Sequence, residues 1–187
     1  MTQGRATVQA EADFTGLYAQ TYGDVLRFVQ RRCHPSHAQD VTAEVFLVAW
    51  RRYDDLPTPF DERRAWLFGV ARKILANDRR GEHRRTALTV RIQAAHEDVQ
   101  PDAHPDLVAA RVDLERAWPR LRPEHQEALA MALWDDLDSA QAGAVLGISA
   151  TAYRIRLSRA RRALRALLAA EPSPSRAERA LPEGEHR

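Results

Sequence analysis

The sequence predicts an all-α protein made of two small helical domains joined by a flexible linker. Apolar residues recur at three- and four-residue steps over most of the chain, the spacing of amphipathic helices, and no stretch has the alternation typical of a strand. A polar stretch containing Pro101 and Pro105 separates the two helical parts. The chain has 187 residues, which is enough for two small domains.

The first domain is predicted over residues 13–81, after a disordered N-terminus at 1–12. Its first helix runs from about Phe14 to Arg32 and is interrupted by Cys33-His34-Pro35. A second helix is predicted from Ser36, because Gln39 follows three residues later as in a capping box. Apolar residues cover much of this helix, which favours a central place in a bundle.

A third helix follows a segment that cannot be helical. Pro57 and Pro59 fix the backbone and lack N–H donors, so the chain from Asp54 to Phe60 is predicted to be a loop. Asp61 is expected to cap the next helix, which extends to about Arg80, with Gly81 as its stop.

Residues 82–105 form the predicted linker, residues 106–170 the second domain, and residues 171–187 a disordered tail. The strongest local motif lies in the second domain. Asp138 and Gln141 predict a capping box, Gly147 a left-handed turn, and Ser149 the cap of a further helix. Two helices joined by a tight glycine turn are typical of a helix-turn-helix.

Basic residues gather in two stretches with an acidic one between them. Residues 62–91 hold nine basic residues against three acids, and residues 150–166 hold six arginines and no acid. Residues 93–118 hold six acids and two arginines. This pattern indicates two contacts with a polyanion, with solvated helix faces as the alternative.

The second helix of the helix-turn-helix is the predicted DNA reader. Its first turns enter the major groove, so Thr151, Tyr153 and Arg154 are placed to contact bases. Arg156 and Arg159 are expected to reach phosphates, which set affinity and register. Arginine suits both tasks because its planar fork pairs two acceptors. The alternative is a helical hairpin with a basic exposed face.

Composition excludes several classes of protein. Hydrophobic residues make up 44% and charged residues 29%, which fits a soluble globular protein. No apolar run approaches the roughly 20 residues that span a bilayer, and the N-terminus lacks a secretory apolar core, so we expect a cytoplasmic protein without membrane insertion. Cys33 is the single cysteine, which excludes an intrachain disulfide.

No cofactor, metal site or catalytic group is predicted, and the chain is not expected to be an enzyme. Cys33, His34 and His37 offer three potential metal ligands. Pro35 interrupts them and no second cluster completes a site, so a turn between helices is the favoured interpretation.

Four segments together resemble the extracytoplasmic-function (ECF, group IV) sigma factors of the sigma-70 family, which direct bacterial RNA polymerase to promoters. Residues 40–52 (DVTAEVFLVAWRR) and 64–72 (RAWLFGVAR) resemble their region 2. Residues 121–129 (LRPEHQEAL) and 137–157 (LDSAQAGAVLGISATAYRIRL) resemble their region 4. The resemblance extends from about Phe14 to Leu168, the linker excepted.

The resemblance implies a set of partners. These are core RNA polymerase, contacted at the β′ clamp helices and the β flap, promoter DNA, and an anti-sigma factor. The residues implied for polymerase binding are Asp40 and Glu44, four apart on one helix face, and Arg51. The family commonly has glutamine at the position of Ala43.

For the −10 promoter element, the resemblance implies a pocket for a flipped base and a path for the melted strand. Apolar or aromatic groups and cations are the chemistry that such a strand requires. Trp66 fits stacking, although its apolar spacing favours a core position. The residues implied are Leu56, Phe60, Arg64, Trp66, Lys73, Asn77 and Arg80.

For the −35 element, the resemblance implies duplex recognition by the helix-turn-helix. Gly143 stands where the family usually has alanine, which is expected to cost up to ~1 kcal/mol of helix propensity. The linker is expected to leave the two readers without a fixed spacing, so that the isolated chain binds promoters poorly. Two alternatives are a conventional helix-turn-helix regulator acting without polymerase, and an enzyme that uses Cys33 or the nearby histidines.

Overall fold

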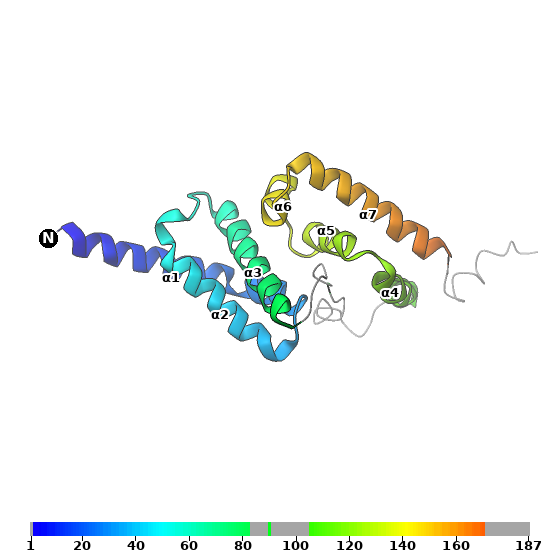
Figure 1. The fold of residues 1–187 in the computed structure, drawn as a ribbon, viewed down its shortest axis with the longest axis horizontal. Coiled ribbons are helices and arrows are strands. Elements are labelled where there is room, and N and C mark those ends of the chain that lie inside the picture. Colours follow the sequence, from blue (N-terminus) through cyan, green and yellow to red (C-terminus); the bar gives the residue numbers. More distant parts are fainter. Residues whose placement is uncertain (1, 83–89, 91–104, 171–187) are drawn as a thin grey trace, which may run out of the picture.

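The computed structural model describes residues 2–82, 90 and 105–170, and this part of the chain forms seven α-helices and no strand (Figure 1). The N-terminal body contains α1 (Thr2–Gln30), α2 (Pro35–Arg51), the short 3-10 helix η1 (Tyr53–Asp55) and α3 (Phe60–Glu82). The C-terminal body contains α4 (Pro105–Ala117), the 3-10 helix η3 (Trp118–Arg120), α5 (Pro123–Leu133), α6 (Ser139–Leu146) and α7 (Ala150–Ala170). The all-α prediction is confirmed. None of these helices is long and apolar enough to cross a membrane.

Three predicted boundaries in the N-terminal body are corrected. α1 begins at Thr2, where disorder was predicted up to residue 12. α2 begins at Pro35 rather than Ser36. Its cap is His34, whose ring nitrogen Nδ1 accepts a hydrogen bond from the Ser36 N–H in the first turn. Pro35 is well placed at this first position, where its missing N–H has no helical partner. α3 begins at Phe60 and continues past Gly81 to Glu82.

Aromatic and aliphatic side chains form the core of the N-terminal body. Phe28 of α1 and Phe68 of α3 are fully buried and stack with their ring centroids 4.6 Å apart. Val45 and Ala49 of α2 are also fully buried, but Leu47 and Trp50 of the same helix are exposed, so α2 buries one face only and its predicted central position is corrected. The α1–α2–α3 bundle is therefore a packed unit.

A second apolar core is formed by residues of η3, α5 and α7, and one residue of the predicted linker is buried in it. Val90 is buried against Trp118. Its N–H donates to Gln126 Oε1 at 3.2 Å, and its carbonyl accepts from Trp118 Nε1 at 2.6 Å. The rest of the linker's interior and the tail at 171–187 lie outside the described residues.

The two bodies touch. α6 lies against α3 (Figure 1), and Leu137, Ala142 and Val145 are buried in the same apolar cluster as the core of the N-terminal body. The sequence predicted that the linker leaves the two domains without a fixed spacing, whereas in this structure α3 and α6 are packed together. The groups that make this contact are described below, because they include several of the predicted site residues.

Candidate nucleic-acid interface

The helix-turn-helix forms as predicted from its caps. Asp138 Oδ1 accepts hydrogen bonds from the N–H groups of Ala140 and Gln141 at 2.7 and 2.8 Å, and Gln141 Oε1 accepts from the Asp138 N–H at 3.0 Å. Gly147 adopts φ 69°, the left-handed conformation that ends α6. Ser149 Oγ then accepts from the Ala152 N–H at 3.1 Å and caps α7.

Gly143 has a packing role that its helix propensity did not predict. A Cβ atom at this position would lie 2.8 Å from the carbonyl oxygen of Ile148 and 3.2 Å from the Ala150 nitrogen. These are backbone atoms, which cannot rotate away as a flexible side chain does. The glycine therefore lets the turn fold closely over α6 and sets the angle at which α7 leaves it.

The six arginines of α7 lie on its accessible faces. Arg156 is half-buried and the others are exposed, and no carboxylate among the described residues forms an ion pair with any of them. Near the start of the helix, Arg154 Nη2 donates to Thr151 Oγ1 at 2.9 Å. The positive charge of α7 is therefore available to an external polyanion.

Tyr153 does not face DNA in this structure, and its predicted role as a base-contacting residue is corrected. Its side chain is buried, and its hydroxyl donates to the Ala128 carbonyl of α5 at 3.0 Å. Burial raises the pKa of Tyr153 to about 12. The sequence did carry a signal: Tyr153, Leu157, Ala160 and Leu164 recur at helical spacing and form the inner face of α7.

The predicted −10 residues occupy different environments. Phe60, Lys73 and Asn77 are exposed, whereas Leu56 and Trp66 are half-buried against the core. Arg80 lies in α3, but its side chain is outside what the structure describes.

Trp66, Lys73 and Asn77 line one wall of a groove of about 860 Å³ between the two bodies. Ala140 and Ala144 of α6 line the other wall. The structure therefore brings the predicted strand path together on α3 and places α6 opposite it.

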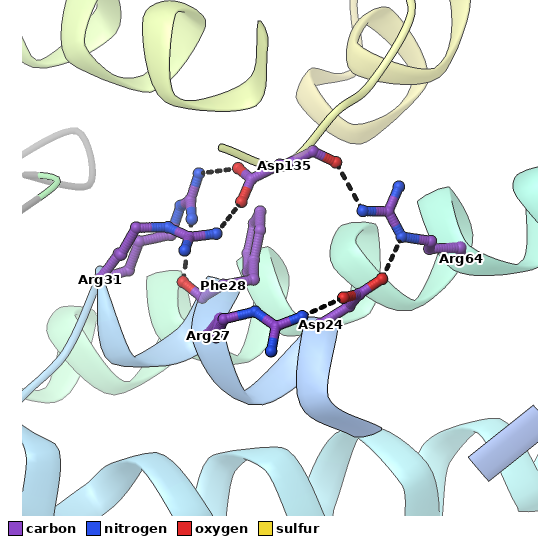
Figure 2. A network of polar contacts seen from close by, with 7 residues as sticks. Asp24, Arg27, Phe28, Arg31, Arg64 and Asp135 are labelled. Carbon is purple, nitrogen blue, oxygen red and sulfur yellow. Dashed lines mark hydrogen bonds and ion pairs between the residues drawn. The ribbon is translucent and has the colours of Figure 1, made fainter. Parts of the chain in front are cut away.

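Arg64 was also predicted to lie along the strand path, but in this structure it binds other groups of the chain. Its Nε binds Asp24 Oδ2 at 2.6 Å, and its Nη2 donates to the carbonyl oxygen of Asp135 at 2.8 Å. Figure 2 shows Arg64 between these two aspartates, one from each body. Its guanidinium also lies 4.9 Å from the ring centroid of Phe68.

Asp135, in the turn between α5 and α6, is the centre of a charge cluster that sequence reasoning missed (Figure 2). Its carboxylate binds Arg31, and it accepts from Arg32 Nη2 at 2.7 Å. Arg32 also donates to the Phe28 carbonyl at 2.9 Å and lies 3.5 Å from the centroid of the Phe28 ring. Burial lowers the pKa of Arg31, and Asp135 opposes this effect. Adjacent arginines at a helix end carry no sequence signal for such a cluster.

The residues predicted to bind polymerase lie on the outside of α2. Asp40, Glu44 and Arg51 are exposed, and within the described ranges no ion pair involves any of the three. At the start of the same helix, His34 Nδ1 lies 2.8 Å from Ser36 Oγ, a role in the turn between helices. Within residues 2–82, 90 and 105–170, no three His, Cys, Asp or Glu side chains are grouped to hold a metal ion.

Comparison with known proteins gives two family matches in the order expected. Residues 17–85 match Sigma-70 region 2, and residues 111–164 match Sigma-70, region 4. The chain is 30% identical over 136 residues to the ECF RNA polymerase sigma factor SigL of Mycobacterium tuberculosis, covering 71% of this chain and 75% of that one. It is 29% identical over 165 residues to the ECF RNA polymerase sigma factor BldN of Streptomyces coelicolor, covering 84% and 61%.

Solved structures agree in fold. The sigma factor RpoE, in complex with the anti-sigma factor NepR from Bartonella quintana, has a TM-score of 0.62 at 19% identity and covers 85% of this chain and 98% of that one. CnrH, in complex with the cytosolic domain of CnrY, has a TM-score of 0.60 at 27% identity and covers 88% and 95%. With both regions present in order and one relative matched over three quarters of its length, the chain belongs to the ECF family of RNA polymerase sigma factors.

Proposed function

We propose a division of labour within this sigma factor, which directs transcription initiation: α7 reads the −35 duplex, α3 captures the melted −10 strand, and α2 docks on core polymerase. The observation that carries the proposal is the charge of α7. This helix is the second of a helix-turn-helix with capped ends, and it presents six arginines that form no ion pair with a carboxylate among the described residues. Catalysis belongs to the polymerase, because members of this family are initiation factors.

On α7, Thr151 and Arg154 are the proposed base-reading residues. Both are exposed in the first turns of the helix, where a recognition helix reaches base edges. Arg156 and Arg159 lie further along and are the proposed phosphate contacts. With Tyr153 in the core, base reading depends on fewer side chains than the sequence predicted.

On α3 and the loop before it, Phe60, Trp66, Lys73 and Asn77 are the proposed −10 surface. They combine aromatic faces, an amide and a cation, the groups that bind an unstacked strand. Leu56 lies at the start of the same loop, and Arg64 lies in α3. Domain limits of 13–81 for region 2 and 106–170 for region 4 are part of this proposal.

The proposed partners are core polymerase, at its β′ clamp helices and β flap, and promoter DNA. The structural relatives include a sigma factor bound to the anti-sigma factor NepR, and we extend this kind of partner to the present chain. The proposed location is the cytoplasm, where polymerase and promoters are.

Run-off transcription with purified bacterial core polymerase on genomic promoter fragments tests the proposal. Start-specific transcripts should appear only when the protein is added. The variant Asp40→Lys/Glu44→Lys should reduce them, because it reverses the exposed charge proposed to meet β′. Asp54→Lys, compared with Asp40→Lys and Glu44→Lys each made alone, is the control matched in charge, since this carboxylate is also exposed but lies in η1. Binding to duplex DNA without any association with core would instead favour a conventional helix-turn-helix regulator.

A further inference from the structure

Ile155 is an exposed apolar side chain on α7, a helix whose other long exposed side chains are arginines. The structure describes every residue of α7, and Ile155, at 49% exposure, is the one large hydrophobic residue of this helix that is exposed. It belongs to neither of the two apolar clusters formed by the described residues. Ile155 therefore does not support the core of either body.

Helix propensity does not explain an isoleucine at this position either. A β-branched side chain loses rotamer freedom in a helix, and isoleucine is a weaker helix former than alanine, leucine or arginine. A single exposed apolar residue is common on protein surfaces and has no meaning by itself. The direction in which Ile155 points, and the residues beside it, decide what it can contact.

Ile155 lies on the outermost face of α7. Tyr153, two residues earlier, is buried, and its hydroxyl donates to the Ala128 carbonyl of α5. Two residues correspond to roughly 200° of rotation about a helix axis, so Ile155 projects almost directly away from the C-terminal body. Thr151 and Arg159 lie four residues before and after it, on the same face, and both are exposed. Ile155 therefore lies between a proposed base contact and a proposed phosphate contact.

The major groove offers one apolar group that an isoleucine can recognise. Phosphates bind cations and hydrogen-bond donors, and the Ile155 side chain has neither. Base edges in the groove carry hydrogen-bond donors and acceptors, and thymine alone adds an apolar C5-methyl group. Contact between this methyl group and an isoleucine removes both surfaces from water, which is favourable. The side chain of Ile155 therefore matches thymine among the four bases.

We propose that Ile155 reads a thymine of the −35 element through its C5-methyl group. The inference rests on the proposed function of α7 as the −35 reader. Arg154, the adjacent residue, donates from Nη2 to Thr151 Oγ1 at 2.9 Å, so a polar and an apolar base contact project from the same turn of the helix. With Tyr153 in the core, Ile155 is the third base-reading side chain of α7.

Deoxyuridine tests this assignment, because it lacks the C5-methyl group of thymidine and keeps the same hydrogen-bonding groups. Holoenzyme is assembled from core polymerase and the full-length protein, and run-off transcription is measured below saturation on a promoter that the wild type uses. Each thymine of the −35 element, on either strand, is replaced in turn by deoxyuridine. Four proteins are compared: the wild type, Ile155→Ala, Ile155→Val and the control Leu133→Ala.

One replacement should lower transcription by the wild type roughly three- to five-fold, the effect of losing one buried methyl group. The same replacement should change transcription by Ile155→Ala less than about 1.5-fold, because the contact is already absent. Ile155→Val keeps a branched apolar side chain and should retain part of the response. Leu133→Ala truncates a side chain that is 58% exposed on α5, and it should respond as the wild type does. Thermal unfolding checks that all four proteins are folded.

The assignment is overturned if no replacement affects the wild type, or if each one affects the wild type and Ile155→Ala equally. If the wild type gives no start-specific transcript with core polymerase, the proposed function fails. The same comparison is then made by fluorescence anisotropy on the duplex that the full-length chain selects from a random pool, so the two proposals are tested separately. A chain that selects no duplex either would overturn both.

Discussion

Arginines in the two bodies meet different surroundings. On α7 they are not ion-paired with any carboxylate among the described residues. In the N-terminal body, six arginines bind aspartate or glutamate: Arg27, Arg31, Arg32, Arg52, Arg64 and Arg72. The ion pairs of Arg31, Arg32 and Arg72 each include a side chain that is almost fully buried. The number of basic residues in a sequence therefore does not report how much positive charge DNA can reach.

The difference arises from the side chains on which each group of arginines packs. The arginines near the contact rest on an aromatic layer, with Arg32 over Phe28 and Arg64 near Phe68. Those of α7 alternate with the buried face of Tyr153, Ala160 and Leu164, so the helix itself turns them outward. Tertiary packing fixes the orientation of the arginines near the contact, whereas helical periodicity fixes the orientation of the arginines on α7.

Phe68→Ala should have the largest effect on stability, because it removes a ring that is 1% exposed and stacked on Phe28. The expected loss is about 3–5 kcal/mol in the free energy of unfolding, measured by urea denaturation. Leu133→Ala is the control, since Leu133 is 58% exposed and its truncation should change stability by less than about 0.5 kcal/mol. A similar effect of both substitutions would contradict the aromatic layer as the support of the N-terminal cations.

Gly143→Ala should destabilise the C-terminal body, because its new Cβ would meet the Ile148 carbonyl oxygen at 2.8 Å. We expect a loss of about 1–3 kcal/mol, as for other overpacked sites. Gly69→Ala is the matched control in α3, where nothing lies within 4 Å of an added Cβ. It should stabilise the chain by roughly 0.5–1 kcal/mol, because alanine has the higher helix propensity. Thermal unfolding of both variants measures the sign, and a stabilising Gly143→Ala would refute the close approach.

Arg154→Ala should affect recognition and leave stability unchanged, since this side chain is exposed. Loss of a base contact is expected to cost about 1–3 kcal/mol at one −35 position and to relax specificity there. Holoenzyme run-off on a functional promoter and on its single −35 substitutions measures this effect.

Arg159→Ala is the comparison within the same helix. A phosphate contact should weaken all sequences alike and lower the salt dependence by about one counterion. If Arg159 showed the position-specific effect and Arg154 the uniform one, their proposed roles would be reversed.

Tyr153→Phe should have the smallest effect, a loss of about 0.5–1.5 kcal/mol from its hydrogen bond to Ala128, with no change in DNA binding. Its pH dependence has a defined sign. The pKa of Tyr153 is raised from 10.0 to about 12 in the folded chain, so the unfolded chain releases the phenolic proton first. The stabilisation is complete below pH 10 and is lost as the pH rises toward 12. Denaturation of both proteins across this range should show a steeper decline for the wild type; weaker DNA binding by Tyr153→Phe would restore the base-contact role.

Local features of the sequence were sufficient to predict the helix-turn-helix and the caps of its two helices. The Asp138–Gln141 box, Gly147 and Ser149 were predicted and are found, because caps and turns depend on residues only a few positions apart. The fold class followed from periodicity for the same reason. Tyr153 was predicted to contact bases because it lies near the start of α7, although its helical spacing places it on the inner face of that helix.

The sequence alone determined an all-α chain, a capped helix-turn-helix and the family to which it belongs. Tertiary structure alone decided which arginines are free and which are bound. Asp135 and Arg31 are 104 positions apart, and no local pattern relates them. It also decided that Val90 is anchored on Gln126 and that Gly143 has no space for a methyl group. The Asp135 and Val90 contacts join segments that are remote in sequence, whereas the Gly143 contact is made within one tight turn, whose exact backbone path the residue types alone do not give.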